Sequence, residues 1–372
     1  MSPHLFTFLI TKYPKFTKIA KTGQELNIYS TNPSKAEALL QMLTDSFDYL
    51  ATIFKPAYPL SKLDIFLEPS IGWAMEHWGL IVYGGNPDRS IMQHLVAHQW
   101  FGNLVSPSAW KHAWLSEGFA TYWEKQVAKE APATFERELY IVIDNDRGLV
   151  PMVLEPFVTL RDLERYPWLR YEKGACLLKM IEGMIGQQPL IDAMNKYLEK
   201  YQYEAVETSL FFDELLSAFD KIRDKMDGIS IQELGKQWTT QPGIPTISVR
   251  KGNGSFVLTQ SSYYKSTTKW DIPIFLYDPH YCTGPGMNET VTFQFFKKEM
   301  TELHVATDMA DEMMTYLETR HNYPCPPAHR ARHLLSDLKR DRNGTIVKRA
   351  LDLLNNKHKE FQDSLVKPFF RR

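Results

Sequence analysis

Two histidines four residues apart, His94 and His98, and a later glutamate, Glu117, constrain the fold of this chain most strongly. They lie in residues 88–129, whose apolar spacing predicts two helices broken near Pro107. At this spacing both imidazoles project from one helix face and can bind one metal ion. Eighteen residues separate His98 from Glu117, so a second helix packed on the first can bring the carboxylate to them. A bare pair of helical histidines is common without a metal, so the surrounding sequence decides its meaning.

The rest of the chain predicts an α+β fold. Apolar patterns predict strands at 1–30, including one at 5–10, a helix at 34–55, two short strands at 63–83 and helices at 172–236. After Gln-Pro-Gly-Ile-Pro at 241–245 the pattern becomes strand-like, which predicts a domain boundary there. From about residue 307 the pattern is helical again.

Composition and charge exclude several classes of protein. Apolar residues make up 44% of the 372 residues and charged residues 23%, as in a globular protein that builds a core. The net charge of −1 gives no sign of a nucleic-acid partner or an anionic membrane surface. No apolar run of about 18 residues and no basic leader occur, so neither a transmembrane helix nor a signal peptide is predicted, and the compartment stays open. Three cysteines favour free thiols, with a Cys282–Cys325 bridge as the alternative.

Several motifs, in family order along the chain, resemble those of the M1 zinc aminopeptidases. Residues 94–105 read H-L-V-A-H-Q-W-F-G-N-L-V, where that family has H-E-x-x-H-Q-W-F-G-N-L-V. Residues 114–122, W-L-S-E-G-F-A-T-Y, are similar to its W-L-N-E-G-F-A-S-Y, and residues 73–80, W-A-M-E-H-W-G-L, to its G-A-M-E-N-W-G-L. Further similar segments lie at 171–175, 243–245 and 329–337. The chain therefore resembles this family over most of its length.

The resemblance implies an architecture. The expected parts are a remnant of the N-terminal β-domain at 1–30, a thermolysin-like, mainly helical catalytic domain at 31–240, a small β-sandwich at 241–305 and the start of a truncated C-terminal helical domain at 306–372. Most of the family's N-terminal β-domain and C-terminal solenoid would then be missing. The surfaces left by those domains predict self-association or a protein partner.

The resemblance also implies a zinc centre with one altered residue. His94, His98 and Glu117 match the three zinc ligands, which leave one position open, as in a catalytic zinc site. Tyr171 matches the tyrosine that donates a hydrogen bond to the oxyanion of the transition state. The family's general-base glutamate, which activates the zinc-bound water and passes its proton to the leaving amine, is Leu95 here. A leucine does neither.

A peptide-binding motif is implied upstream of the zinc centre. Ala74, Met75 and Glu76 match it, and in the family the glutamate binds the free amine of the substrate. Two positions depart from the family: its glycine is Trp73 and its asparagine is His77. A tryptophan at this position is expected to fill the cleft where substrate backbone would lie.

Leu95 leads to two hypotheses from different classes. The first is a pseudoenzyme that binds zinc and peptides, or a protein partner, without turnover. The alternative is an active zinc aminopeptidase with weak turnover, which uses Tyr171 and Glu76. A family carboxylate near the site has also been replaced, by His112. The missing base favours the first hypothesis, and a fragmentary product without a stable role is the third.

Overall fold

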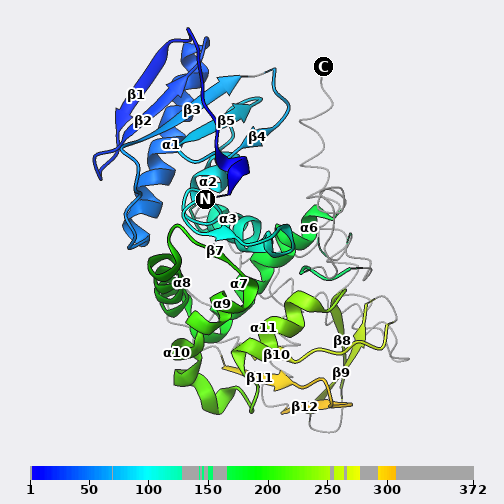
Figure 1. Ribbon diagram of the computed structural model, residues 1–372. Coiled ribbons are helices and arrows are strands. Elements are labelled where there is room, and N and C mark those ends of the chain that lie inside the picture. The colour runs from blue at the N-terminus through cyan, green and yellow to red at the C-terminus, as the bar shows by residue number, and fades with distance from the viewer. Residues whose placement is uncertain are drawn as a thin grey trace, which may run out of the picture. The chain divides into compact units, whose positions relative to one another are not determined.

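A computed structural model describes residues 2–68, 70–127, 142, 145, 150–153, 166–251, 255–263, 266–276 and 292–306. The chain divides into two compact units, Met1–Pro242 and Gly243–Arg372. Helices and several sheets occur together (Figure 1), which confirms the predicted α+β class. The predicted helical segment at 306–372 lies outside the described residues except for residue 306, and so do Cys282 and Cys325.

The first unit contains a five-stranded sheet in the order β1-β2-β3-β5-β4. Its strands are β1 (Lys15–Ile19), β2 (Glu25–Tyr29), β3 (Lys62–Glu68), β4 (Ala74–Met75) and β5 (Leu80–Gly84). β2, β3 and β5 are parallel, whereas β1 and β4 pair antiparallel at the two edges. The strands predicted at 1–30 and at 63–83 therefore belong to one sheet, and β4 is an edge strand.

The helix α1 (Pro33–Ile53) connects β2 to β3 and packs against β1 and β2 (Figure 1). Its first turn is capped by Asn32, whose side chain accepts a hydrogen bond from the backbone N–H of Lys35 at 3.0 Å. Alternate strand residues such as Ile65 are fully buried, and so is Phe47 on α1. Apolar side chains that recur every second residue on the strands and every three to four residues on the helix thus form one core.

The strand predicted at residues 5–10 is not present. A short 3-10 helix, η1 (Pro3–Leu5), comes first, and residues 6–10 form no strand. Phe6, Phe8 and Ile10 are 72%, 78% and 89% exposed. The prediction was wrong because alternating apolar residues favour an extended chain but do not provide the neighbouring strand that a sheet needs.

Helices make up most of the other described residues of this unit. They are α2 (Arg89–Ala97), η2 (Trp110–His112), α3 (Trp114–Val127), α6 (Pro167–Arg170), α7 (Glu172–Ile185), α8 (Gln187–Tyr201), α9 (Thr208–Glu214), α10 (Leu216–Phe219), η3 (Asp220–Lys225) and α11 (Ile231–Thr240). A short parallel pair, β6 (Ser106–Pro107) and β7 (Ala205–Val206), lies between them in sequence. No helix in the described ranges combines the length and apolarity that a membrane span needs.

Two glycines let α3 and α7 pack closely. A Cβ atom added to Gly118 would lie 2.9 Å from the Cα of Gly174, closer than such atoms approach in proteins. Only glycine at both positions therefore permits this helix crossing. The crossing positions the site, because Glu117 precedes Gly118 on α3 and Tyr171 lies at the start of α7.

The second unit contains two small antiparallel sheets within its described residues. One has the order β12-β9-β8, with β8 (Pro245–Lys251), β9 (Ser255–Ser262) and β12 (Leu303–Ala306), and the other pairs β10 (Ile272–Leu276) with β11 (Thr292–Phe296). Gln260 on β9 exchanges two hydrogen bonds with the backbone of Trp270, at 3.0 and 3.1 Å, and donates to the carbonyl of Lys297 at 3.2 Å. Its buried amide therefore ties the segments around both sheets together.

Candidate metal centre

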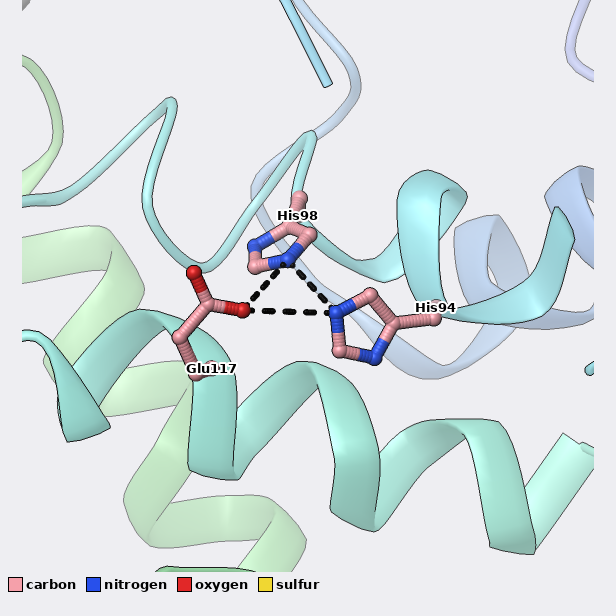
Figure 2. A group of neighbouring side chains, drawn as sticks. All are labelled: His94, His98 and Glu117. Carbon is pink, nitrogen blue, oxygen red and sulfur yellow. Dashed lines mark hydrogen bonds and ion pairs between the residues drawn. The ribbon is translucent and has the colours of Figure 1, made fainter. Parts of the chain in front are cut away.

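The helices α2 and α3 bring the three predicted ligands together (Figure 2). The N-terminus of α2 is capped by Asp88, whose side chain accepts a hydrogen bond from the backbone N–H of Ile91 at 3.1 Å. His94 lies in its last turn and His98 caps its end, so the two rings share one face. Glu117 lies in the first turn of α3 and points at both rings. The packing of α2 on α3 thus brings the side chains of His94, His98 and Glu117 into one cluster.

The distances between the three donor atoms fit one metal ion. His94 Nε2 lies 2.9 Å from His98 Nε2, and Glu117 Oε2 lies 3.4 and 3.2 Å from these two nitrogens. Ligand atoms about 2.0–2.2 Å from a tetrahedral zinc ion are about 3.3 Å apart. Glu117 Oε2 is buried and has no hydrogen-bond partner of good geometry. A buried carboxylate oxygen without such a partner is costly, and a cation among the three atoms would satisfy it.

Each histidine uses its other ring nitrogen to contact the protein. His98 Nδ1 lies 3.1 Å from the carbonyl oxygen of Phe101 and 3.0 Å from Ser116 Oγ. Because a carbonyl only accepts hydrogen bonds, a proton on Nδ1 leaves the lone pair of Nε2 directed at the centre. His94 Nδ1 lies 3.3 Å from Glu124 Oε2 in the same way. Both rings are therefore oriented to offer Nε2 to a metal.

Glu124 was not predicted from the sequence, although its position carries a signal. It lies seven residues after Glu117, two turns along the same face of α3. Its carboxylate also accepts hydrogen bonds from Ser90 Oγ and, at 2.7 Å, from Lys125 Nζ. Burial raises the pKa of Glu124, but His94 and Lys125 outweigh burial and lower it to about 2. The carboxylate is therefore ionised and holds the ring of His94 in place.

The electrostatics of the centre favour a cation. Burial lowers the pKa of His94, but the carboxylates of Glu117 and Glu124 outweigh burial and raise it to about 10. Burial raises the pKa of Glu117, but the two histidines outweigh burial and hold that pKa well below its usual range. Two buried carboxylates therefore stabilise positive charge at this place, whether it is a proton on His94 or a metal ion.

Tyr171 lies beside the candidate ligands. Its ring stacks on that of His94, with centroids 5.6 Å apart and planes inclined by 10°. The charge of Glu117 and then burial raise the pKa of Tyr171 well above its usual range. Its hydroxyl thus stays protonated and remains a hydrogen-bond donor. Leu95 is 4% exposed, so the position that would carry a general base is apolar and buried.

The predicted peptide-binding motif forms the edge of the sheet. Ala74 and Met75 are strand β4, and Glu76 follows directly. The negative charge of Glu76 contributes to the raised pKa of Tyr171, so the two side chains are close enough to interact through their charges. Trp73 is 58% exposed. Its ring is therefore not packed inside the protein, and the expectation that it fills the cleft stays a prediction.

Two further histidines differ in their surroundings. His112 is buried and contacts Thr208 Oγ1 at 2.9 Å, and Trp114 Nε1 donates to the same oxygen at 2.9 Å. This network holds the start of α3. His4, which no motif had indicated, packs its ring 4.8 Å from that of Trp110. Burial lowers the pKa of His4, and the charges of Glu76 and Glu117 oppose that effect, so η1 lies near the centre.

Comparison with known proteins gives matches to one family. The model of the Peptidase family M1 domain matches residues 38–238. Glutamyl aminopeptidase of Sus scrofa is 28% identical over 276 residues, which is 67% of this chain and 28% of that protein. Aminopeptidase N of Haemonchus contortus is 30% identical over 323 residues, 74% of this chain and 33% of that protein. Aminopeptidase Q of Homo sapiens is 27% identical over 315 residues, which is 74% of this chain and 32% of that protein. The chain spans about a third of the length of these relatives.

Proposed function

The chain belongs to peptidase family M1, whose model covers more than half of it, and we propose that it binds zinc and peptides but is catalytically impaired at Leu95. The observation that carries the proposal is the combination of three converging ligands with an apolar residue directly after His94. Aminopeptidase-type function follows from the family and its named relatives.

Zinc binding is supported by the donor set. His94, His98 and Glu117 would hold the ion, and two nitrogens with one carboxylate oxygen are typical zinc ligands. An ion bound there supplies positive charge that polarises a carbonyl group and acidifies water. Glu124 and the carbonyl of Phe101 would keep the two rings oriented toward it.

Peptide binding is supported by the edge strand. On one side β4 pairs with β5, through Ala74 with Tyr83 and Met75 with Val82, and within the described sheet its other side has no strand. An extended peptide can add to such an edge through main-chain hydrogen bonds. Glu76 at the end of β4 would then bind the peptide's α-ammonium group by charge. The site therefore suits the amino-terminal end of a peptide.

Catalytic impairment is supported by the roles of the remaining carboxylates. Hydrolysis requires a group that takes a proton from water and passes it to the leaving amine, a contribution worth about 10²–10⁴-fold in rate. Glu117 is used as a ligand, Glu124 holds His94, and Glu76 is assigned to the peptide amine. Tyr171 stays protonated and cannot accept a proton. Each of these three carboxylates therefore already has a role in the proposed site other than that of the base.

The proposal is tested on the purified chain loaded with zinc. We expect about one zinc per chain, and His98→Ala should remove it while His304→Ala, a change on the exposed strand β12, should retain it. Hydrolysis of aminoacyl amides should stay at the level of the His98→Ala protein. A metal-free wild-type chain after reconstitution would contradict the zinc site.

A weak aminopeptidase is the second candidate function. The position of Tyr171 against His94 favours it, because a donor for a developing oxyanion is still in place. Turnover by the unmodified chain that is abolished by a chelator, and absent from His98→Ala, would establish this candidate. The same result would contradict the proposal that the chain is catalytically impaired.

A further inference from the structure

A pair of buried amides connects the segment that carries Glu76 to the end of the zinc-ligand helix. Asn103 Nδ2 donates to the backbone carbonyl of Glu76 at 2.7 Å, and Gln99 Nε2 donates to the same oxygen at 3.3 Å. Gln99 Oε1 accepts a hydrogen bond from the backbone N–H of Gly79 at 3.1 Å. Gln99 is 0% and Asn103 1% exposed, so water does not compete for these bonds.

The two amides belong to a turn that is itself fixed to a ligand. Gln99 directly follows His98, and the backbone N–H of Asn103 donates to the carbonyl of His98 at 3.1 Å. Gly102 in this turn has a φ of +111°, and a Cβ there would lie 2.3 Å from Ser116 Oγ. The turn is therefore closed and packed, with few alternative conformations.

The receiving segment is equally constrained. The backbone N–H of Leu80 donates to the carbonyl of His77 at 3.1 Å, which closes a tight turn after Glu76. Gly79 in this turn has a φ of +78°, and a Cβ there would lie 2.6 Å from Leu60 Cδ1. Two rigid turns joined by buried hydrogen bonds keep a constant separation. One carries Glu76 and the other carries the ligand His98.

We propose that Gln99 and Asn103 are positioning residues that fix the distance between Glu76 and the ligands His94 and His98. This inference rests on the proposed function, in which Glu76 binds the amino terminus of a peptide. The separation between that anchor and the metal decides which peptide bond reaches the metal. The two amides therefore favour peptides whose free amino terminus lies at this fixed distance from the metal, and they act through Glu76 without touching the peptide.

The test compares free and blocked peptides on the zinc-loaded full chain. Trialanine amide and its N-acetyl derivative are titrated, and the ratio of their affinities is the readout, since a merely structural role would lower both affinities alike. We expect the unmodified chain to prefer the free peptide. Asn103→Ala and the nearly isosteric Gln99→Met should each reduce that preference about tenfold, the effect of losing a buried hydrogen bond. Zinc content should not change.

A matched control exists in the same unit. Asn195 is 3% exposed and bridges two backbone groups in the same way, donating to the carbonyl of Ile53 at 3.1 Å and accepting from the N–H of Lys55 at 2.9 Å. Asn195→Ala should lower stability but keep the preference for the free peptide. Hydrogen exchange of residues 77–80 should increase in Asn103→Ala and not in Asn195→Ala.

The outcomes separate this inference from the proposed function. If the unmodified chain prefers the free peptide and both amide variants keep that preference with zinc bound, the inference is overturned. Equal loss of preference in Asn195→Ala overturns it as well, because the effect would then be general destabilisation. If the unmodified chain binds neither peptide, the proposed peptide binding fails first, and the positioning role fails with it.

Discussion

In the candidate metal centre, the residues that orient the three side chains matter as much as those three side chains. His94 and His98 each direct one ring nitrogen at the protein and the other at Glu117. A carboxylate holds the first ring and a backbone carbonyl holds the second. Loss of such an outer contact leaves a ligand in place but free to rotate, which weakens metal binding without abolishing it.

Glu124→Gln tests whether the contact with Glu124 orients the ring of His94 for metal binding. The amide keeps the shape of the side chain but loses the negative charge that faces His94 Nδ1. We expect zinc affinity to fall about 10- to 100-fold, measured by competition with a chromophoric chelator. Glu182→Gln is the control, because that carboxylate on α7 accepts hydrogen bonds from Tyr122 of α3 and Lys179 of α7, and neither is a candidate ligand. Unchanged affinity in Glu124→Gln would show that the negative charge of Glu124 is not needed to orient the ring.

Leu95→Glu tests the missing base. Leu95 is 4% exposed, so a glutamate there would be poorly solvated, and we expect the zinc-free variant to melt at a lower temperature than the wild type. With zinc, hydrolysis of aminoacyl amides should rise above the wild-type background by up to about 10²-fold. A smaller gain is expected, because residues that act as one catalytic unit are not additive.

Leu95→Gln is the matched control for that experiment. It has nearly the size and polarity of glutamate but cannot take a proton at neutral pH. If glutamine raises turnover as much as glutamate does, the gain comes from polarity and not from proton transfer. If neither variant gains activity, the defect lies in the peptide site, where Trp73 and His77 replace the family's residues.

At the scale of elements, the crossing of α3 and α7 positions the site. The absence of side chains at Gly118 and Gly174 lets the helices approach, and residues close to these glycines in the sequence reach the centre. Glu117 comes from α3, and Tyr171, which stacks on His94, comes from the start of α7. A wider crossing would separate the two side chains without changing either of them.

Gly118→Ala should therefore affect stability and metal binding together. The added methyl group would press on Gly174, and overpacking of this kind costs about 1–3 kcal/mol of unfolding free energy. Denaturant unfolding measures the cost, and zinc titration should show weaker binding. Gly72→Ala is the control, because a Cβ there meets no atom within 4 Å. Full stability and full zinc affinity in Gly118→Ala would mean that the helices can separate freely.

At the scale of the whole molecule, the candidate site belongs to one unit. His94, His98, Glu117, Tyr171 and Glu76 all lie in Met1–Pro242, and none lies in Gly243–Arg372. A ligand stabilises only the structure that binds it, in proportion to its affinity and concentration. Zinc should therefore act on the first unit alone.

Hydrogen exchange with and without zinc measures this effect. We expect slower exchange in α2 and α3 on addition of zinc, because opening either helix would release the metal. Exchange in β8 and β9 should stay the same, since these strands carry no ligand among the described residues. Protection of both units by zinc would instead show that they unfold together.

The sequence by itself determined the chemistry of the site. Spacings of four along a helix and a recognisable order of motifs predicted His94, His98 and Glu117, which the structure brings within 4.8 Å of one another. The sequence also carries Leu95 directly after His94, where the resemblance to the family leads us to expect the general base. Such features were predictable because helix periodicity is local, so two residues four apart in one helix, such as His94 and His98, lie on the same face.

Only the tertiary structure decided how these residues are held. Three features join segments of the chain that share no local sequence pattern. They are the contact of Glu124 with His94, the hydrogen bonds from Gln99 and Asn103 to Glu76, and the position of His4 near the centre. For the same reason residues 5–10 were predicted as a strand, although they do not belong to any described sheet. Contacts of this kind depend on how whole elements pack, and periodicity along the chain does not carry that information.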